Sequence, residues 1–255
     1  MKIIFSDFDG TLVEKNKLKN KADISAIKKF REEGNLFVIC TGRCLQEIQR
    51  DLPKYNIPYD YLILNNGSQI IDQNFNIIYN KTINKDIGKE ILNQLLKYKD
   101  MWVYFTCEQY SYGMLNHVVT NQLTGKQENV DFIQSYKKAS NFNILCFVQE
   151  NYKTDIILNV IEELKSKYSK YVEIYLNTCF VDIVAKGCSK GNGIHLLKEI
   201  LNAPATTFAI GDSYNDLPMI RAANKGYTFK NVDISKEINN QVDSIEELIK
   251  EIEGE

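Results

Sequence analysis

The sequence predicts a Rossmann-like α/β protein whose doubly wound parallel sheet is interrupted by an inserted α+β domain. Short apolar runs alternate with helical patterns at both ends of the chain, which is typical of such a sheet. Between these two parts the strands come in adjacent pairs, as an antiparallel sheet requires. Polar clusters follow several of the parallel strands, at the edge where open α/β sheets bind ligands.

The first part of the chain has the order β-α-β-α-β. Strands are predicted at Lys2–Ser6, Leu36–Cys40 and Tyr61–Leu64, and the last two are continuous apolar runs that suit strands buried on both faces. Helices are predicted between them. Apolar residues recur at helical spacing over Ile24–Glu33, which a glycine ends, and a second helix covers Leu45–Leu52.

The alternation of single strands and helices stops after residue 83, where two helix-strand-strand units follow each other. The helices are predicted at Asp86–Tyr98 and Asp155–Tyr168. This order indicates a small α+β domain. Its strands are predicted at Trp102–Thr106, Tyr110–Tyr112, Ile144–Val148, Tyr171–Tyr175 and Phe180–Val184.

Near Cys188 the alternation of helices and single strands that is typical of a parallel sheet resumes. A helix at Asn192–Leu201, a strand at Thr207–Ile210 and a short helix at Leu217–Ala222 follow, and the Ser-x-x-Glu pattern at Ser244 opens a last helix. An insertion explains this order, so the predicted domains are a core of residues 1–82 and 185–255 and an inserted domain of residues 83–184.

Composition excludes several classes of function. The formal net charge is −2, and no basic run is long enough for a nucleic-acid or anionic-membrane surface. No segment approaches the ~20 apolar residues of a membrane span. The six cysteines form no disulfide framework or zinc pattern and are expected to be reduced. We therefore expect a cytoplasmic protein without a nucleic-acid or membrane partner. Its expected oligomeric state is a monomer or weak homodimer.

The motif that says most about function lies at the end of the first strand. It is Asp7-Phe8-Asp9-Gly10-Thr11. Side chains two residues apart in an extended segment point the same way, so Asp7 and Asp9 can face one site. Crowded carboxylates and phosphate oxygens are ligands that Mg²⁺ prefers. The alternative is an ordinary strand-end turn, since Asp and Gly are common turn residues.

Three further clusters strengthen the prediction of a phosphate site. Thr41-Gly42-Arg43 follows the second strand and could bind phosphate oxygens or simply cap a helix. In Gly211-Asp212-Ser213-Tyr214-Asn215-Asp216, polar residues return to one side of a turn. Lys190 begins a helix, where a cation opposes the helix dipole unless its partner is an anion.

Taken together, these clusters resemble in order the four motifs of the haloacid-dehalogenase-like (HAD) phosphohydrolases. The long insertion, with Asn65-Asn66-Gly67-Ser68 before it, resembles the Cof-type subfamily IIB with a C2-type cap. One segment departs from that pattern, because Gly226–Val232 stands where Cof-type members usually have a Gly-Val-Ala-Met-like strand. The resemblance implies a phosphoric monoester hydrolase that uses Mg²⁺.

The resemblance also implies roles for individual residues. Asp7 would be the nucleophile that forms an aspartyl-phosphate, and Asp9 the general acid and base. Mg²⁺ would be bound by Asp7, the main-chain carbonyl of Asp9 and Asp212, while Asp216 would orient Lys190 or a metal-bound water. The groups that would hold the transferring phosphoryl are the backbone N–H of Phe8, Thr41, the N–H of Gly42, Lys190 and Asn215.

Alternatives remain at the level of substrate and reaction. The pair Asp7 and Asp9 is compatible with hydrolysis of small phosphorylated metabolites such as sugar phosphates, and also with a phosphomutase. A regulator that binds phosphosugars without turnover is a third hypothesis. In the inserted domain Trp102 and Tyr104 could line a sugar-binding face, but they are expected to be core residues. His117 could touch the substrate, but a lone histidine is more often an ordinary surface residue.

Overall fold

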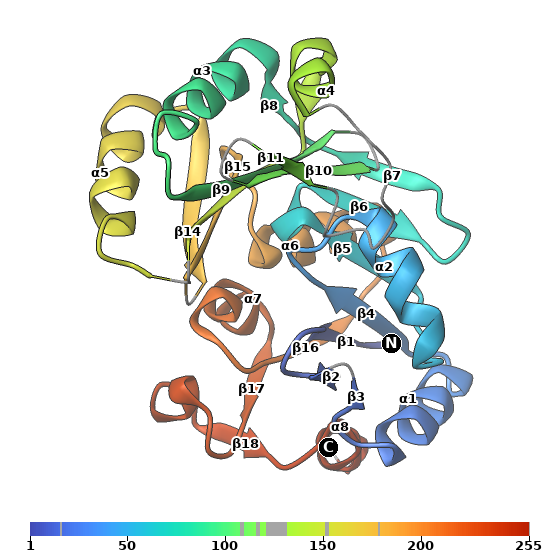
Figure 1. The fold of residues 1–255 in the computed structure, drawn as a ribbon. Coiled ribbons are helices and arrows are strands. Elements are labelled where there is room, and N and C mark those ends of the chain that lie inside the picture. The colour runs from blue at the N-terminus through green and yellow to red at the C-terminus, as the bar shows by residue number, and fades with distance from the viewer. Residues whose placement is uncertain are drawn as a thin grey trace. The chain divides into compact units, whose positions relative to one another are not determined.

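The computed structural model describes residues 1–15, 17–107, 110–115, 118–120, 132–150, 153–177 and 179–254 (Figure 1). The chain divides into two compact units. The first comprises Met1–Thr41, Arg50–Tyr79 and Ser189–Glu255, and the second comprises Gly42–Gln49 and Asn80–Cys188. The domain boundaries predicted at residues 82/83 and 184/185 stay a prediction.

The first unit is built on an eight-stranded sheet in the order β18-β17-β16-β1-β4-β5-β6-β7. The strands from β18 to β5 are parallel to their neighbours, and β6 runs antiparallel to β5. The strands are β1 (Lys2–Asp7), β4 (Leu36–Cys40), β5 (Tyr61–Leu64), β6 (Gln69–Asp72), β7 (Ile77–Asn80), β16 (Thr206–Gly211), β17 (Lys225–Phe229) and β18 (Asn240–Val242), with a separate hairpin of β2 (Val13–Glu14) and β3 (Lys17–Leu18).

Helices cover the sheet of the first unit. One buried cluster joins Ile194 and Leu197 of α6 and Met219 of α7 to the apolar side chains of β1, β4, β5 and β16. Elsewhere α1 and α8 pack against each other (Figure 1). The helices are α1 (Ala22–Glu32), α6 (Lys190–Leu201), α7 (Leu217–Ala222) and α8 (Ile245–Glu253), with short 3-10 turns η1 (Leu52–Lys54), η2 (Asn65–Gly67), η5 (Tyr214–Asp216) and η6 (Asp233–Lys236).

The second unit holds an antiparallel six-stranded sheet in the order β11-β10-β9-β13-β15-β14. Its buried core joins one face of this sheet to α3, α4 and α5. The elements are α2 (Leu45–Asp51), β8 (Ile83–Asn84), α3 (Lys85–Leu95), β9 (Met101–Cys107), β10 (Tyr110–Leu115), β11 (Val118–Thr120), α4 (Phe132–Lys138), β12 (Asn141–Phe142), β13 (Ile144–Gln149), α5 (Ile157–Tyr168), β14 (Val172–Asn177) and β15 (Phe180–Ala185).

The predicted α/β fold with a parallel sheet and an α+β insertion is confirmed. The apolar runs at Leu36–Cys40 and Tyr61–Leu64 are strands with those bounds. The expectation that Trp102 and Tyr104 are core residues is wrong. Both are half-buried, because side chains alternate along β9 and its core face is taken by Val103 and Phe105.

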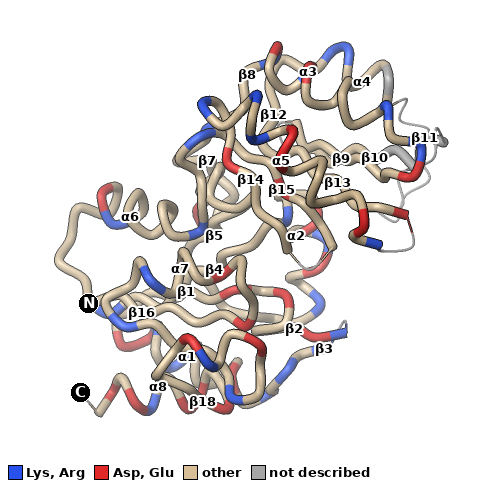
Figure 2. Tube along the Cα trace, turned by 90° about the vertical axis from the view of Figure 1, so that its left-hand side faces the viewer, with Lys and Arg blue, Asp and Glu red and all other residues tan. Residues whose placement is uncertain are grey.

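Both α1 and α8 carry basic and acidic positions along the chain trace (Figure 2). Lys28 pairs with Glu32 and Lys29 with Glu33, each across one helical turn. Both lysine side chains are largely exposed, so these adjacent residues form a solvated helix face. Within the described ranges, no helix has the length and apolar character needed to span a membrane.

Candidate active site

Neighbouring parallel strands bring three of the sequence clusters to one edge of the sheet in the first unit. The register pairs Asp7 at the end of β1 with Cys40 at the end of β4, directly before Thr41. On the other side, β1 pairs with β16, which ends at Gly211, directly before Asp212. Because parallel strands end together, residues far apart in the sequence meet here.

A buried lysine lies between two carboxylates at this edge. The Lys190 Nζ donates to Asp7 Oδ1 at 2.6 Å and to Asp216 Oδ1 at 2.7 Å. The side chains of all three are at most 6% exposed. Lys190 is the first residue of α6, and the Ser189 hydroxyl caps that helix by accepting from the Asn192 N–H. The predicted anionic partner of this helix-start lysine is therefore present.

Asp212 lies against the turn that follows β1. Its Oδ1 accepts a hydrogen bond from the Thr11 hydroxyl at 2.8 Å. Gly10 has a left-handed φ of 90°, and a Cβ at this position would stand 2.3 Å from the Asp212 Oδ2. Only glycine therefore fits between the turn and this carboxylate. The sequence interpretation named Thr11 in the motif but gave it no role.

The loop after β16 is organised by Asp216. Its Oδ2 accepts from the N–H groups of Asp212 and Ser213, both at 3.1 Å, and from the Ser213 hydroxyl. Asn215 Oδ1 is a second acceptor within reach of the same hydroxyl, whose single proton the two acceptors share. With its Oδ1 on Lys190, both oxygens of Asp216 are engaged, which favours an orienting role over metal ligation.

Burial and charge crowding set the protonation of this cluster. Burial raises the pKa of Asp7, and Asp216 and Asp212 add to the increase against the opposing effect of Lys190. Burial also raises the pKa of Asp212. Burial lowers the pKa of Lys190, but Asp216 and Asp7 outweigh it and raise that pKa, so Lys190 is an ammonium.

The donor set fits a divalent cation. Carboxylate oxygens of Asp7, Asp212 and Asp216 lie within 4.8 Å of one another. Asp7 Oδ2 is buried and has no hydrogen-bond partner among the described residues. A buried oxygen of this kind is costly unless something binds it, and hard cations such as Mg²⁺ bind carboxylate oxygens. Three carboxylates against one ammonium also leave an excess of negative charge.

The other predicted residues lie around this cluster. The Asp9 side chain is exposed, and Asp9 forms a bridge with Val13 at the start of the hairpin. The Phe8 ring is buried, with an edge-on contact to Tyr55 at 6.2 Å between ring centroids. Thr41 is buried, and its N–H donates to the Ile63 carbonyl. Gly42 belongs to the second unit, so its predicted phosphate contact stays a prediction.

The segment Asn65–Gly67, noted in the sequence only as a subfamily feature, contacts the start of α6. Asn65, Asn66 and Gly67 all have left-handed φ values, of 49°, 51° and 88°. A Cβ on Gly67 would lie 2.0 Å from the Ser189 carbonyl oxygen. The Asn66 N–H donates to the Thr41 carbonyl at 3.1 Å. This turn therefore connects the end of β4 to the helix that carries Lys190.

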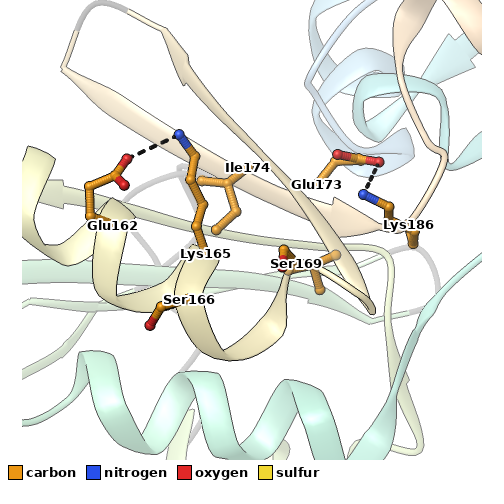
Figure 3. A pocket seen from close by; sticks show the side chains of 8 residues that line it. Glu162, Lys165, Ser166, Ser169, Glu173, Ile174 and Lys186 are labelled. Atoms are coloured by element: carbon orange, nitrogen blue, oxygen red, sulfur yellow. Dashed lines mark hydrogen bonds and ion pairs between the residues drawn. The ribbon is translucent and has the colours of Figure 1, made fainter.

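A separate pocket lies in the second unit, between α5 and the hairpin of β14 and β15 (Figure 3). Its two lysines are paired with glutamates, Lys165 with Glu162 at 3.3 Å and Lys186 with Glu173 at 3.0 Å. Because each ammonium already has a carboxylate, the pocket offers no uncompensated positive charge for a phosphate. His117, for which the sequence left open a substrate contact or an ordinary surface position, lies outside the described residues.

Comparison with known proteins identifies the family. The family model of haloacid dehalogenase-like hydrolases matches residues 4–247. The chain belongs to this family. A 5-amino-6-(5-phospho-D-ribitylamino)uracil phosphatase from Bacillus subtilis strain 168 is 26% identical over 259 residues, which cover 91% of this chain and 88% of the relative.

Solved structures show the same fold over the whole length. A HAD/COF-like hydrolase from Plasmodium vivax has a TM-score of 0.80 at 22% identity and covers 100% of this chain and 96% of its own. The HAD subclass IIB sugar phosphatase BT4131 has a TM-score of 0.71 at 20% identity, covering 100% and 98%. The predicted Cof-type HAD hydrolase is confirmed, and the chain is a phosphoric monoester hydrolase.

Proposed function

We propose that this HAD hydrolase is a Mg²⁺-dependent phosphatase of small phosphorylated metabolites, which works through an aspartyl-phosphate on Asp7. The observation that carries the proposal is the state of the Asp7 carboxylate. One oxygen is held by the Lys190 ammonium at 2.6 Å, and the other is buried and has no hydrogen-bond partner among the described residues. A carboxylate oriented in this way is a suitable nucleophile.

In the first half-reaction, an oxygen of Asp7 attacks phosphorus and the bond between phosphorus and the ester oxygen breaks. The leaving alcohol needs a proton, and Asp9 would donate it. The exposed side chain of Asp9 is compatible with reaching a substrate from the solvent side of the turn. The products of this step are the free alcohol and the phosphorylated Asp7.

In the second half-reaction, Asp9 acts as a base. Its carboxylate accepts a proton from a water molecule as that water attacks phosphorus, and the bond from phosphorus to the Asp7 oxygen breaks. Inorganic phosphate leaves and both carboxylates return to their starting states. The two steps therefore balance without any reagent other than water.

Asp7 and Asp212, with the Asp9 main-chain carbonyl, would hold Mg²⁺. When bound, the cation would shield the negative charge of the phosphate from the attacking carboxylate. Lys190 would add a second positive charge, held in place by Asp216. Thr41, Asn215 and the N–H groups of Phe8 and Gly42 would hydrogen-bond the remaining phosphoryl oxygens.

The substrate class rests on relatives and on charge. One relative is named for a phosphorylated ribityl compound and one structural neighbour for sugar phosphates, and both names denote small phosphate esters. The formal net charge of −2 does not favour a polyanionic polymer as substrate. We propose sugar phosphates or related metabolites as substrates and, from the sequence, a cytoplasmic location.

The nucleophile is tested with p-nitrophenyl phosphate and Mg²⁺. Asp7→Asn should lower hydrolysis by about 10³-fold or more, since it replaces the attacking carboxylate. Asp9→Asn is the matched variant. Because p-nitrophenolate leaves without a proton, this variant should still form the phosphoenzyme and then hydrolyse it slowly, so that mass spectrometry of acid-quenched protein finds a phosphoryl group on the Asp7 peptide.

Two results would contradict the proposal. Undiminished Mg²⁺-dependent hydrolysis by Asp7→Asn would remove Asp7 as the nucleophile. A panel of phosphorylated metabolites then tests the reaction type. Little phosphate release, together with isomerisation of a sugar phosphate that requires a bisphosphate activator, would establish a phosphomutase instead.

A further inference from the structure

Lys19, directly after the hairpin of β2 and β3, lies next to the turn that contacts Asp212. Its ammonium donates to the Gly10 carbonyl oxygen at 2.7 Å. The same Nζ lies 3.8 Å from the centroid of the Phe229 ring, a cation–π distance. The Lys19 N–H donates to the Leu12 carbonyl at 3.0 Å, which fixes where the side chain starts.

The peptide that Lys19 contacts determines how Asp212 is held. Gly10 and Thr11 share a peptide unit, and its oxygen is the acceptor for the lysine. On the other side of this turn, Gly10 packs against the carboxylate and the Thr11 hydroxyl donates to Asp212 Oδ1 at 2.8 Å. A rotation of this peptide would move both contacts. Lys19 therefore acts on Asp212 through the turn and not by touching it.

Phe229 belongs to the segment that departs from the pattern of the subfamily. The residue before it, Thr228, is buried and donates its hydroxyl to the Gly211 carbonyl at 2.7 Å. Gly211 directly precedes Asp212. Consecutive residues of β17 thus support Asp212 from two directions, Thr228 through Gly211 and Phe229 through Lys19 and Gly10.

We propose that Lys19, held by its cation–π contact with Phe229, is a positioning residue for the metal-binding carboxylate Asp212. This inference rests on the metal site of the proposed function. Partners that orient a metal ligand typically change metal affinity when they are removed. Here the orienting group is an exposed lysine on a hairpin, so it can be replaced without opening the core.

Whether loss of the Lys19 charge weakens or strengthens metal binding distinguishes a positioning role from simple charge repulsion. The Lys19 ammonium binds the Gly10 carbonyl, and the next residue, Thr11, donates to Asp212, so the positive charge lies near the metal-binding carboxylate. A positive charge near a cation site repels the cation. If charge alone mattered, removing it would strengthen metal binding. If the lysine positions Asp212, removing it weakens binding.

The test measures Mn²⁺ binding to metal-free protein by electron paramagnetic resonance of the free ion. Lys19→Met should weaken binding about three- to tenfold, at the lower end of the ~10–100-fold range for such partners. Lys19→Arg should restore it, and Phe229→Leu should weaken it less in the same direction. Lys17→Met, which removes an equal charge from the same hairpin, is the control and should not weaken binding.

The outcomes are distinct. Unchanged or tighter Mn²⁺ binding by Lys19→Met, with normal binding by the wild type, would overturn the positioning role and leave the proposed function intact. Equal weakening by Lys17→Met would also overturn it, since the effect would then belong to the hairpin's charge. A wild-type protein that binds no Mn²⁺ would overturn the metal site and this inference together. Thermal unfolding of each variant confirms that the fold is retained.

Discussion

Ion pairs in the two units show how burial changes what a lysine does. In the first unit Lys190 is 2% exposed and lies between Asp7 and Asp216. In the second unit Lys186 is 53% exposed and pairs with Glu173 at a similar distance. Water screens the exposed pair, whereas the buried one interacts strongly and has no solvent to replace a lost partner. Similar distances therefore have very different consequences.

The charge balance differs as well. The pocket of the second unit contains as many glutamates as lysines, each engaged with the other (Figure 3). The cluster of the first unit has three carboxylates around one ammonium, and one carboxylate oxygen lacks a partner among the described residues. Only the cluster around Lys190 in the first unit needs an additional cation. The candidate active site therefore lies at this cluster and not at the pocket of the second unit.

Removal of the buried lysine should have the largest effect. Lys190→Met is expected to reduce phosphatase activity about 10²–10³-fold, because the transferring phosphoryl loses its main protein countercharge. It should also cost about 3–5 kcal/mol of stability, since Asp7 and Asp216 are left without an ammonium. Lys186→Met is the matched control and should lie within about 0.5 kcal/mol of wild type by denaturant unfolding. Equal effects of the two variants would contradict the contrast between the units.

Metal removal should abolish activity and make stability depend on pH. Burial raises the pKa of Asp7 and of Asp212 above the ordinary 3.8, so folding favours their protonated forms. The free energy of unfolding of metal-free protein should therefore fall as pH rises above about 4. Mg²⁺ should oppose this loss, adding about 2.7 kcal/mol at a hundredfold excess over its Kd. Thermal unfolding across pH, with chelator or with Mg²⁺, measures both.

Gly67→Ala should be destabilising and should displace the start of α6. A side chain there meets a left-handed φ and the Ser189 carbonyl at 2.0 Å. Gly34 is the matched control, because its φ is also left-handed, at 83°, but a Cβ would meet nothing within 4 Å. Gly34→Ala should cost about 1 kcal/mol, and Gly67→Ala about 1–3 kcal/mol more. Similar losses for the two would show that the contact with Ser189 is relieved easily.

The smallest expected effect concerns Asp23, a buried carboxylate whose nearest partners are N–H groups. It accepts from the Glu246 N–H at 2.9 Å and from the Asn20 amide at 3.2 Å. Burial raises its pKa from 3.8 to about 6. Since the protonated form is favoured in the folded chain, this residue should lower the free energy of unfolding as pH rises from 3.8 to about 6.

Asp23→Asn should flatten the pH dependence of unfolding in that window, because the amide oxygen still accepts from the helix N–H but does not ionise. Asp86→Asn, at an exposed first-turn position of α3, is the comparison variant. A slope that persists in Asp23→Asn would assign the pH dependence to other groups, with Asp7 and Asp212 as the first candidates.

The sequence predicted much of the fold because the signals are local. Continuous apolar runs identified β4 and β5 with their bounds, and the Ser-x-x-Glu pattern identified the start of α8, where the Ser244 hydroxyl accepts from the Glu247 N–H. The same reasoning failed for Trp102, since strand alternation shows that a residue faces one side but not which side is covered. The antiparallel extension β6–β7 also lacked a clear sequence signal.

For the site, the sequence by itself determined the chemical groups and their order, because the HAD motifs are short and each lies at a strand or helix end. Which atoms meet was decided only by the tertiary structure. Lys190 and Asp7 are 183 positions apart, and Thr11 and Asp212 are 201 apart. Contacts of this kind depend on how parallel strands align and on backbone approaches such as Gly10 on Asp212, and neither leaves a local pattern.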